Sequence, residues 1–219
     1  MGEVDVVALK EATIDILDGE FLVILGPSGS GKSTLLNLLG GMDRPSSGTV
    51  SYDGAMLSEF NDRQLTMYRR HEVGFVFQFY NLVPTLTALE NVEVATELSR
   101  DPMDAKEALR LVGLEKRADH FPAQMSGGEQ QRVSIARAIA SNPRLLLCDE
   151  PTGALDVATS REILRLLLHY NRDFGRTVII ITHNSALTGL ADRIAQIRDG
   201  SIASVHENEN LITVEEVDW

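Results

Sequence analysis

A glycine-rich loop between an apolar run and an apolar-periodic segment constrains this sequence more than any other feature. The apolar run covers residues 21–25, the loop covers 26–34, and residues 35–39 repeat apolar side chains at helical spacing. This order predicts a strand, a loop and a helix. The glycines let the loop turn its N–H groups inward around a phosphate, and the helix N-terminus adds partial positive charge.

The loop has the pattern G-x-x-x-x-G-K-S, which argues against a glycine-rich turn without a ligand because the strand and the helix that the pattern requires are both present. Lys32 can reach the β- and γ-phosphates of a nucleotide, and the Ser33 hydroxyl can ligate Mg²⁺. The chain is therefore predicted to bind a nucleoside triphosphate. The predicted nucleotide-binding residues of the loop are Gly26, Pro27, Ser28, Gly29, Ser30, Gly31, Lys32, Ser33 and Thr34.

Composition narrows the class of protein. The length of 219 residues fits one large domain, or one domain with an inserted subdomain, and 43% hydrophobic residues are enough for a core. A net charge of −12 lowers the expectation of a nucleic-acid partner. No stretch reaches the roughly 18 apolar residues that a membrane span needs, and no signal segment opens the chain. We expect a cytosolic protein that works at a membrane only through a partner.

Alternating strand and helix patterns predict an α/β fold with a parallel sheet and crossover helices. Residues 79–128 change character and are predicted to be a mainly helical insertion. The tail, residues 207–219, is either packed on the body as a short strand and helix or frayed. The predicted strands lie within residues 4–25 (where Val4, Val6, Ile14 and Ile16 alternate with other residues) and at 48–52, 73–77, 145–148 and 177–181. The predicted helices run from Asp101-Pro102 to Gly113, from the glycines at 127–128 to about Ser141, and over about 157–172.

Two carboxylates follow the apolar run at residues 145–148. Asp149 suits a water-mediated contact to Mg²⁺ opposite Ser33, and Glu150 suits a general base for an attacking water. Acidic residues often end buried strands without any such role. The phosphate loop upstream favours the functional interpretation, because that loop needs an acidic partner for its metal.

Residues 125–132 read Met-Ser-Gly-Gly-Glu-Gln-Gln-Arg. Ser126 and Glu129 match a helix capping box, which is a purely structural interpretation. A capped helix N-terminus with exposed glycine amides is also an anion site, so both interpretations can hold together.

The order of these motifs resembles that of ATP-binding-cassette (ABC) ATPases. The resemblance covers about residues 20–200 and depends on the loop at 26–34, Gln78, residues 126–128, residues 149–150, residues 153–156 and residues 181–183. It implies a P-loop NTPase fold of the RecA-like type, with a mainly parallel core, N-terminal antiparallel strands and an inserted helical subdomain. The implied core comprises residues 1–78 and 129–219, and the implied helical subdomain comprises residues 79–128.

The resemblance also implies roles for individual residues. The signature Ser126, Gly127 and Gly128 would close on the γ-phosphate held by a second copy, so that a head-to-tail dimer encloses two ATP. Gln78 would sense the metal and the attacking water and couple to a transmembrane partner. His183 would contact the γ-phosphate, and Asp156 would communicate across the dimer. The implied catalytic residues are Lys32, Gln78, Glu150 and His183, and the implied metal ligands are Ser33, Gln78 and Asp149.

A finer resemblance points to the group that serves lipoprotein-releasing, macrolide-exporting and peptide-exporting systems with FtsX-like permeases. It implies such a permease as partner and a position at the inner face of the membrane. Two alternatives stay open. One is the same ATPase controlling a periplasmic or cell-wall process through a permease-like partner. The other is a soluble cassette ATPase acting on DNA or ribosomes, a type that carries long coiled coils or two cassettes. The stretches that resemble the group are 35–48, 73–84, 86–92 and 149–156.

The sequence departs from the family pattern in two places. Met125 and Glu129 stand where the family most often has Leu and Gln, and Glu129 either weakens phosphate binding slightly or is held in the helix cap. The family stacks adenine on an aromatic residue of an early strand, whereas the only aromatic residue before the loop is Phe21. A stacked base is worth about 1–3 kcal/mol, so we expect weaker and less base-selective nucleotide binding than in relatives with that aromatic residue.

Overall fold

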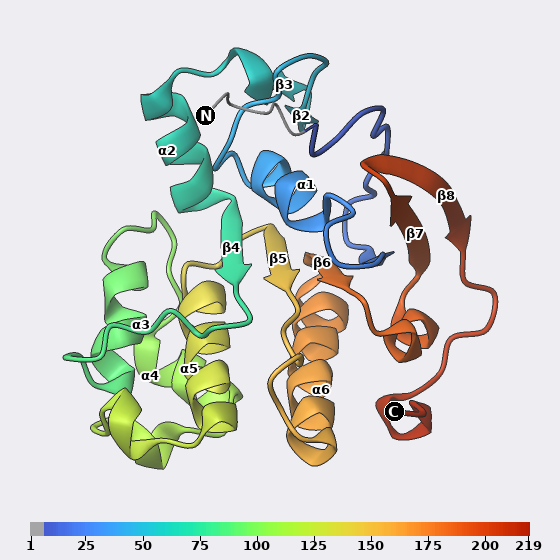
Figure 1. Cartoon of the computed structure of the whole chain (residues 1–219). Helices are drawn as coiled ribbons and strands as arrows, with labels where there is room; N and C mark the ends of the chain where they lie inside the picture. The colour runs from blue at the N-terminus through green and yellow to red at the C-terminus, as the bar shows by residue number, and fades with distance from the viewer. Residues whose placement is uncertain (1–6) are drawn as a thin grey trace, which may run out of the picture.

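The computed structural model describes residues 7–219 and contains one sheet of six strands in the order β4-β5-β6-β1-β7-β8 (Figure 1). The five strands from β4 to β7 are parallel, and β8 pairs antiparallel with β7. The strands of this sheet are β1 (Phe21–Leu25), β4 (Val73–Val76), β5 (Leu145–Asp149), β6 (Thr177–Thr182), β7 (Arg193–Arg198) and β8 (Ser201–Glu207). A separate antiparallel pair consists of β2 (Ser51–Tyr52) and β3 (Ala55–Met56). These findings confirm the α/β class and the mainly parallel core.

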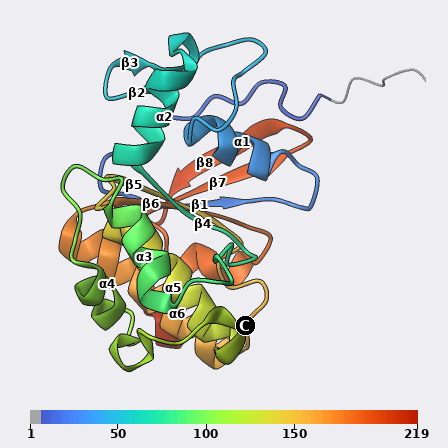
Figure 2. The same cartoon turned by 90° about the vertical axis from the view of Figure 1, so that its left-hand side faces the viewer.

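Helices cover both faces of the sheet, with α1 and α2 on one side and α3 to α6 on the other (Figure 2). The helices are α1 (Lys32–Leu39), α2 (Asp62–His71), α3 (Ala88–Thr96), α4 (Ala105–Leu111), α5 (Gly127–Ala140) and α6 (Val157–Phe174). None of the helices between residues 7 and 219 combines the length and the apolar character that crossing a bilayer requires.

Side-chain alternation along the central strands separates two apolar cores. Leu22 and Ile24 of β1 pack toward α1 and α2, whereas Phe21 and Val23 pack toward the larger set of helices. Because both faces of a parallel strand are buried, its sequence is apolar throughout. The run in β5 and the run in β6 show this pattern, and both predicted strands are confirmed.

The predicted strand before β1 is wrong for residues 7–20, which form no regular element. The alternation that suggested it is real, because Ile14 and Ile16 pack against the core beneath α1. That packing comes without a ladder of backbone hydrogen bonds to a neighbouring strand, and such a ladder is what defines a strand. Val4 and Val6 lie outside the described residues.

Two helix predictions meet different outcomes. The predicted helix start at Asp101-Pro102 is wrong, because α4 begins at Ala105. The side chain of Asp104 caps α4 by accepting hydrogen bonds from the amides of Lys106 and Glu107, at 2.9 and 3.0 Å. The helix that follows the two glycines is confirmed as α5, and α6 runs two residues beyond the predicted end at 172.

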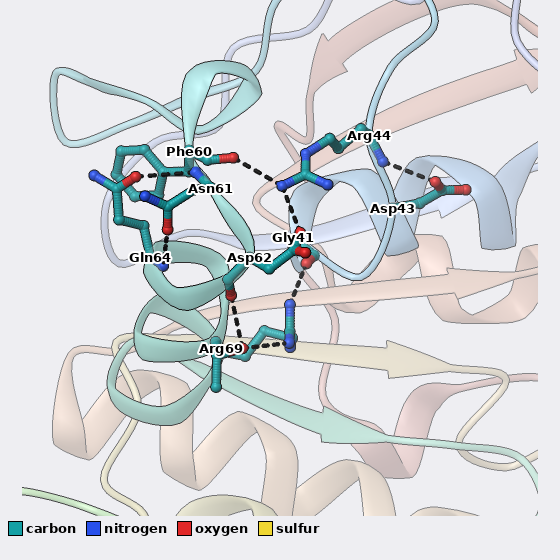
Figure 3. A network of polar contacts seen from close by, with 9 residues as sticks. Gly41, Asp43, Arg44, Phe60, Asn61, Asp62, Gln64 and Arg69 are labelled. Atoms are coloured by element: carbon teal, nitrogen blue, oxygen red, sulfur yellow. Dashed lines mark hydrogen bonds and ion pairs between the residues drawn. The ribbon is translucent and has the colours of Figure 1, made fainter.

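Helix α2 was not predicted, because most of its residues are polar and only Leu65 and Tyr68 are buried. Its signal is the capping box at its start, in which Asn61 and Gln64 each accept a hydrogen bond from the other's backbone amide (Figure 3). Arg69 then ties the helix to the chain after α1 by donating to the carbonyl of Gly41 at 2.6 Å.

The C-terminal tail packs on the body, which decides between the two interpretations of its sequence. Val214 and Val217 are buried in the core on the α6 side of the sheet. Arg165 of α6 pairs with Glu215 at 2.8 Å. The tail therefore adds apolar contacts and an ion pair to α6.

Leu147 at the centre of β5 provides a test of the core beneath α1 and α2. Leu147→Ala removes a fully buried side chain. We expect it to lower the free energy of unfolding by about 2–5 kcal/mol, because the remaining cavity closes only in part. Urea denaturation monitored by circular dichroism measures this change. Leu211→Ala, at an exposed position of the tail, is the matched control and should change stability by less than about 0.5 kcal/mol.

Candidate nucleotide-binding site

The predicted site residues come from loops at the carboxyl ends of neighbouring parallel strands. The glycine-rich loop follows β1, Gln78 follows β4, Asp149 ends β5 and Glu150 follows it, and His183 follows β6. Carboxyl ends of parallel strands meet at one edge of a sheet, and ligands of α/β folds bind at that edge.

The loop after β1 depends on glycine at defined positions. Gly29 and Gly31 have φ angles of +77° and +100°, which side-chain-bearing residues rarely adopt. A Cβ on Gly26 would lie 2.5 Å from the carbonyl oxygen of Ile197 in β7, and one on Gly31 would lie 2.5 Å from the carbonyl oxygen of Ala8. The loop therefore packs between β7 and the chain at residue 8, and these contacts fix its backbone conformation.

The geometry of this loop fits a triphosphate. Lys32 is buried, and its Nζ donates to the carbonyls of Gly26 and Pro27 at 2.7 and 2.9 Å, which holds the ammonium group under the loop. The first amides of α1 have no acceptor within the helix, so they are free to face an anion. The hydroxyl oxygen of Ser30 is buried and has no hydrogen-bond partner among the described residues.

Ser33 and Asp149 form the part of the site that suits a metal. The Ser33 hydroxyl donates to Asp149 Oδ2 at 3.1 Å, although the two residues are far apart in the sequence. Burial raises the pKa of the Asp149 carboxyl group. No group of three or more His, Cys, Asp or Glu residues suited to a metal occurs between residues 7 and 219. Mg²⁺ usually binds through one or two carboxylates plus substrate phosphates, so this sparse set of oxygen ligands fits Mg²⁺.

Gln78 lies beside Gly153, in the turn that follows Glu150. A Cβ on Gly153 would be 3.2 Å from Gln78 Nε2 and 3.5 Å from the Glu150 carbonyl oxygen. The structure thus brings Gln78 next to the turn that follows Glu150. Its contact with a metal stays a prediction.

The Glu150 carboxylate is held by residues at the end of β6. Its Oε2 accepts a hydrogen bond from the Thr182 hydroxyl, and its Oε1 accepts one from the His183 amide, both at 2.9 Å. The imidazole Nδ1 of His183 lies 2.7 Å from the same Oε1. The backbone of Glu150 has φ +47°, a strained conformation for a residue with a side chain. The structure therefore brings His183 together with Glu150 and fixes the carboxylate.

The signature residues begin α5 as the capping box predicted. Ser126 caps the helix by accepting from the Glu129 amide at 3.3 Å, and Glu129 Oε2 accepts from the Ser126 amide at 2.8 Å. The Glu129 carboxylate also pairs with Arg117 at 3.1 Å. The hydrogen bond from the Ser126 amide lowers the pKa of Glu129. The extra negative charge is thus held in the cap.

The two signature glycines are packed against neighbouring elements. A Cβ on Gly127 would lie 2.7 Å from the Tyr80 hydroxyl, and one on Gly128 would clash with Thr159 Cγ2. Thr159 in turn donates its hydroxyl to Asp156 Oδ2 at 2.6 Å, and Asp156 caps α6. The structure therefore places Asp156 beside the signature. Among the described residues, no hydrogen bond or ion pair joins residues 126–128 to the loop at 26–34.

Sequence reasoning did not assign roles to two buried residues, Gln131 and Thr182. The side-chain amide of Gln131 donates to the Pro151 carbonyl at 2.8 Å and to the Phe77 carbonyl at 3.4 Å, and its side chain is 0% exposed. A polar residue at a core-facing position of α5 was the available signal.

The contact between Gly128 and Thr159 yields a prediction that sequence patterns do not. Gly128→Ala should gain about 0.5–1 kcal/mol from helix propensity, but the new methyl group collides with Thr159 Cγ2. We expect a net loss of stability in the native chain. In a Thr159→Ser background, which removes that methyl group and keeps the hydroxyl, the same change should be neutral or stabilising.

Thermal unfolding of the four proteins in this cycle measures the coupling between the two residues. Equal effects of Gly128→Ala in both backgrounds would show that Thr159 is not the obstacle.

Comparisons with known proteins agree with this geometry. The family model described as "ABC transporter" matches residues 9–153. A putative ABC transporter ATP-binding protein of Mycoplasma pneumoniae is 46% identical over 214 residues, which are 96% of this chain. This chain spans only 46% of that relative's length.

Two further matches extend the comparison. The macrolide export ATP-binding/permease protein MacB of Rhodopirellula baltica is 43% identical over 210 residues, covering 93% of this chain and 31% of that protein. The dimeric post-hydrolysis structure of the ATP-binding cassette MJ0796, bound to ADP and Pi, superposes with a TM-score of 0.88 at 43% identity. That match covers 96% of this chain and 95% of the other. With its phosphate loop, fixed carboxylate and capped signature helix at these positions, the chain belongs to the ABC transporter family of ATP-binding proteins.

Proposed function

We propose that this chain is the ATP-hydrolysing subunit of an ABC transporter, that two copies enclose two ATP, and that they drive an FtsX-like permease. The observation that carries the proposal is the placement of the Glu150 carboxylate at the sheet edge that also carries the phosphate loop and the Ser33–Asp149 pair. These are the parts that in-line transfer of a phosphoryl group to water requires.

Hydrolysis in this proposal is mostly positioning and electrostatics. Lys32 and the loop amides offset negative charge on the phosphoryl group that is transferred. Ser33, Asp149 and Gln78 would hold Mg²⁺, which supplies further charge stabilisation when bound. Glu150 orients the attacking water and accepts its proton. The His183 amide keeps Oε1 of Glu150 in place. The His183 side chain is 65% exposed, so its imidazole can reach the γ-phosphate.

The second copy completes the site. The N-terminus of α5 at Ser126 carries partial positive charge and two glycines without side chains, a suitable surface for a phosphate held by the partner copy. The dimeric structure of MJ0796 with ADP and Pi supports a dimer of two such chains. Asp156, beside the signature, would then carry the state of one site to the other.

The permease partner is proposed from the MacB relative, whose name joins an ATP-binding and a permease function in one protein. In this chain, motion would pass through Gln78 and the helical residues 79–128 between the two parts of the core, 1–78 and 129–219. The side chain of Phe79, next to Gln78, is 75% exposed and offers an apolar contact there. The proposed location is the cytoplasm, at the inner face of the membrane.

Glu150→Gln tests the catalytic proposal. The amide cannot accept the water proton, so kcat for ATP hydrolysis should fall by about 10²- to 10⁴-fold. ATP binding should persist, and the protein should change from monomer to dimer on addition of Mg-ATP. Light scattering with and without nucleotide, together with phosphate release, measures both effects.

The exposed Glu97→Gln is the matched control and should behave as the native chain. Turnover near the native rate in Glu150→Gln would remove Glu150 from the role of base. A persistent monomer with ATP bound would contradict the proposed dimer.

Asp149→Asn tests the proposed metal site. The change keeps the shape of the side chain and removes its charge, so the Mg²⁺ concentration for half-maximal hydrolysis should rise by about 10- to 100-fold. Binding of ATP in the presence of a chelator should change little. Asp53→Asn, an exposed residue at a turn with φ +48°, is the control. An unchanged Mg²⁺ requirement in Asp149→Asn would place the metal elsewhere.

A further inference from the structure

Thr182, the last residue of β6, touches three parts of the site although its side chain is only 1% exposed. Its hydroxyl donates to Glu150 Oε2 at 2.9 Å and accepts from the Asn184 amide at 3.0 Å. Its backbone carbonyl accepts from the Gly26 amide at 3.2 Å, at the entry to the phosphate loop. One buried residue thus links the proposed base, the loop that carries His183, and the nucleotide-binding loop.

The direction of the hydroxyl bond is fixed by its surroundings. A hydroxyl group has a single hydrogen and two lone pairs. The Asn184 amide can only donate, so it takes a lone pair, and the hydrogen is left for the carboxylate. The rest of β6 is Thr-Val-Ile-Ile-Ile, and a valine would suit the end of this strand as well as a threonine does. The hydroxyl is therefore explained by the carboxylate and the amide that it contacts.

The Glu150 carboxylate needs such a partner. Its backbone at φ +47° turns the side chain back toward β6, and the His183 amide holds only Oε1. Without a donor at Oε2, the carboxylate can pivot about the hydrogen bond between the His183 amide and Oε1. A carboxylate has about four acceptor positions, so binding Thr182 and His183 still leaves room for a water molecule.

We propose that Thr182 is a positioning residue for ATP hydrolysis, whose hydroxyl holds Oε2 of Glu150 at a fixed place relative to the phosphate loop. Thr182 transfers no proton and touches no phosphate in this role, and the proton of the attacking water goes to Glu150. The inference rests on the proposed role of Glu150 as the general base. Because the Thr182 carbonyl accepts from the Gly26 amide at 3.2 Å, the same residue ties the base to the start of the phosphate loop.

A pair of substitutions isolates the hydroxyl. Thr182→Val keeps the size and the β-branched shape and removes the donor, whereas Thr182→Ser keeps the donor and removes the methyl group. We expect Thr182→Val to lower kcat for Mg-ATP hydrolysis by about 10- to 100-fold, the range for losing a hydrogen bond to a charged group. The KM for ATP should change by less than about threefold, because the hydroxyl group that is removed does not contact ATP in this proposal. Thr182→Ser should restore most of kcat.

The same substitution in a Glu150→Gln background separates positioning from a general structural role. With the base removed, its position no longer matters, so Thr182→Val should cause no further loss of the residual rate, measured in long single-turnover incubations. If Thr182→Val lowered the residual hydrolysis rate of Glu150→Gln as much as it lowers kcat of the native chain, and also raised the KM, Thr182 would have a structural role and the proposal would be overturned. An unchanged kcat in Thr182→Val alone would overturn it as well.

Two additional outcomes are distinguishable. If Thr182→Val does not fold, Thr182→Ala removes the same hydroxyl with a smaller side chain and is compared with Thr182→Ser under the same criteria. If Glu150→Gln retains near-native turnover, the role of Glu150 as base fails, and with it the role given to Thr182. If Glu150→Gln is inactive and Thr182→Val is fully active, only the inference about Thr182 fails.

Discussion

The register of three adjacent parallel strands is the constraint on which the site depends. In β6, Thr182 pairs with Leu25, the residue before the phosphate loop, and Ile181 pairs with Asp149 on the other side. A slip of one residue would send every side chain of a strand to the opposite face. Both faces of β6 are buried, with Val178 and Ile180 in one core and Ile179 and Ile181 in the other, so such a slip would exchange the side chains that fit these two close-packed cores. The cores that stabilise the sheet thus also set the spacing between the loop and the carboxylates.

Two kinds of contact position the functional groups on this frame. The phosphate loop depends on the absence of side chains at Gly26 and Gly31, where neighbouring backbone approaches closely. The carboxylates depend instead on hydrogen bonds from other segments, Ser33 for Asp149 and the end of β6 for Glu150. The signature helix combines both, since Ser126 caps it and Gly128 makes room for Thr159. The strained backbone of Glu150 shows that its orientation is maintained against a local cost.

Patterns of local sequence predicted the elements whose cause is local. The phosphate loop, the buried strands β5 and β6, and the capped start of α5 follow from glycine spacing, apolar runs and a capping box. Residues 7–20 misled the prediction because packing alone produces alternation, and α2 was missed because little of it is buried. The family resemblance pointed to Gln78, Asp156 and His183 as site residues, and their roles stay predictions. It assigned no role to Thr182 or Gln131, because their contacts with Glu150 and Pro151 join segments that are distant in sequence and leave no local pattern.

The buried amide of Gln131 has a mechanical consequence. The Gln131 side chain on α5 donates to the carbonyl of Phe77, next to Gln78, and to the carbonyl of Pro151, next to Glu150. It therefore joins three segments by hydrogen bonds. Because both bonds start from one side chain, a displacement of α5 at Gln131 would stretch or break both of them. The first turns of α5 are therefore tied to the backbone beside Gln78 and beside Glu150, the two loops at this edge of the sheet.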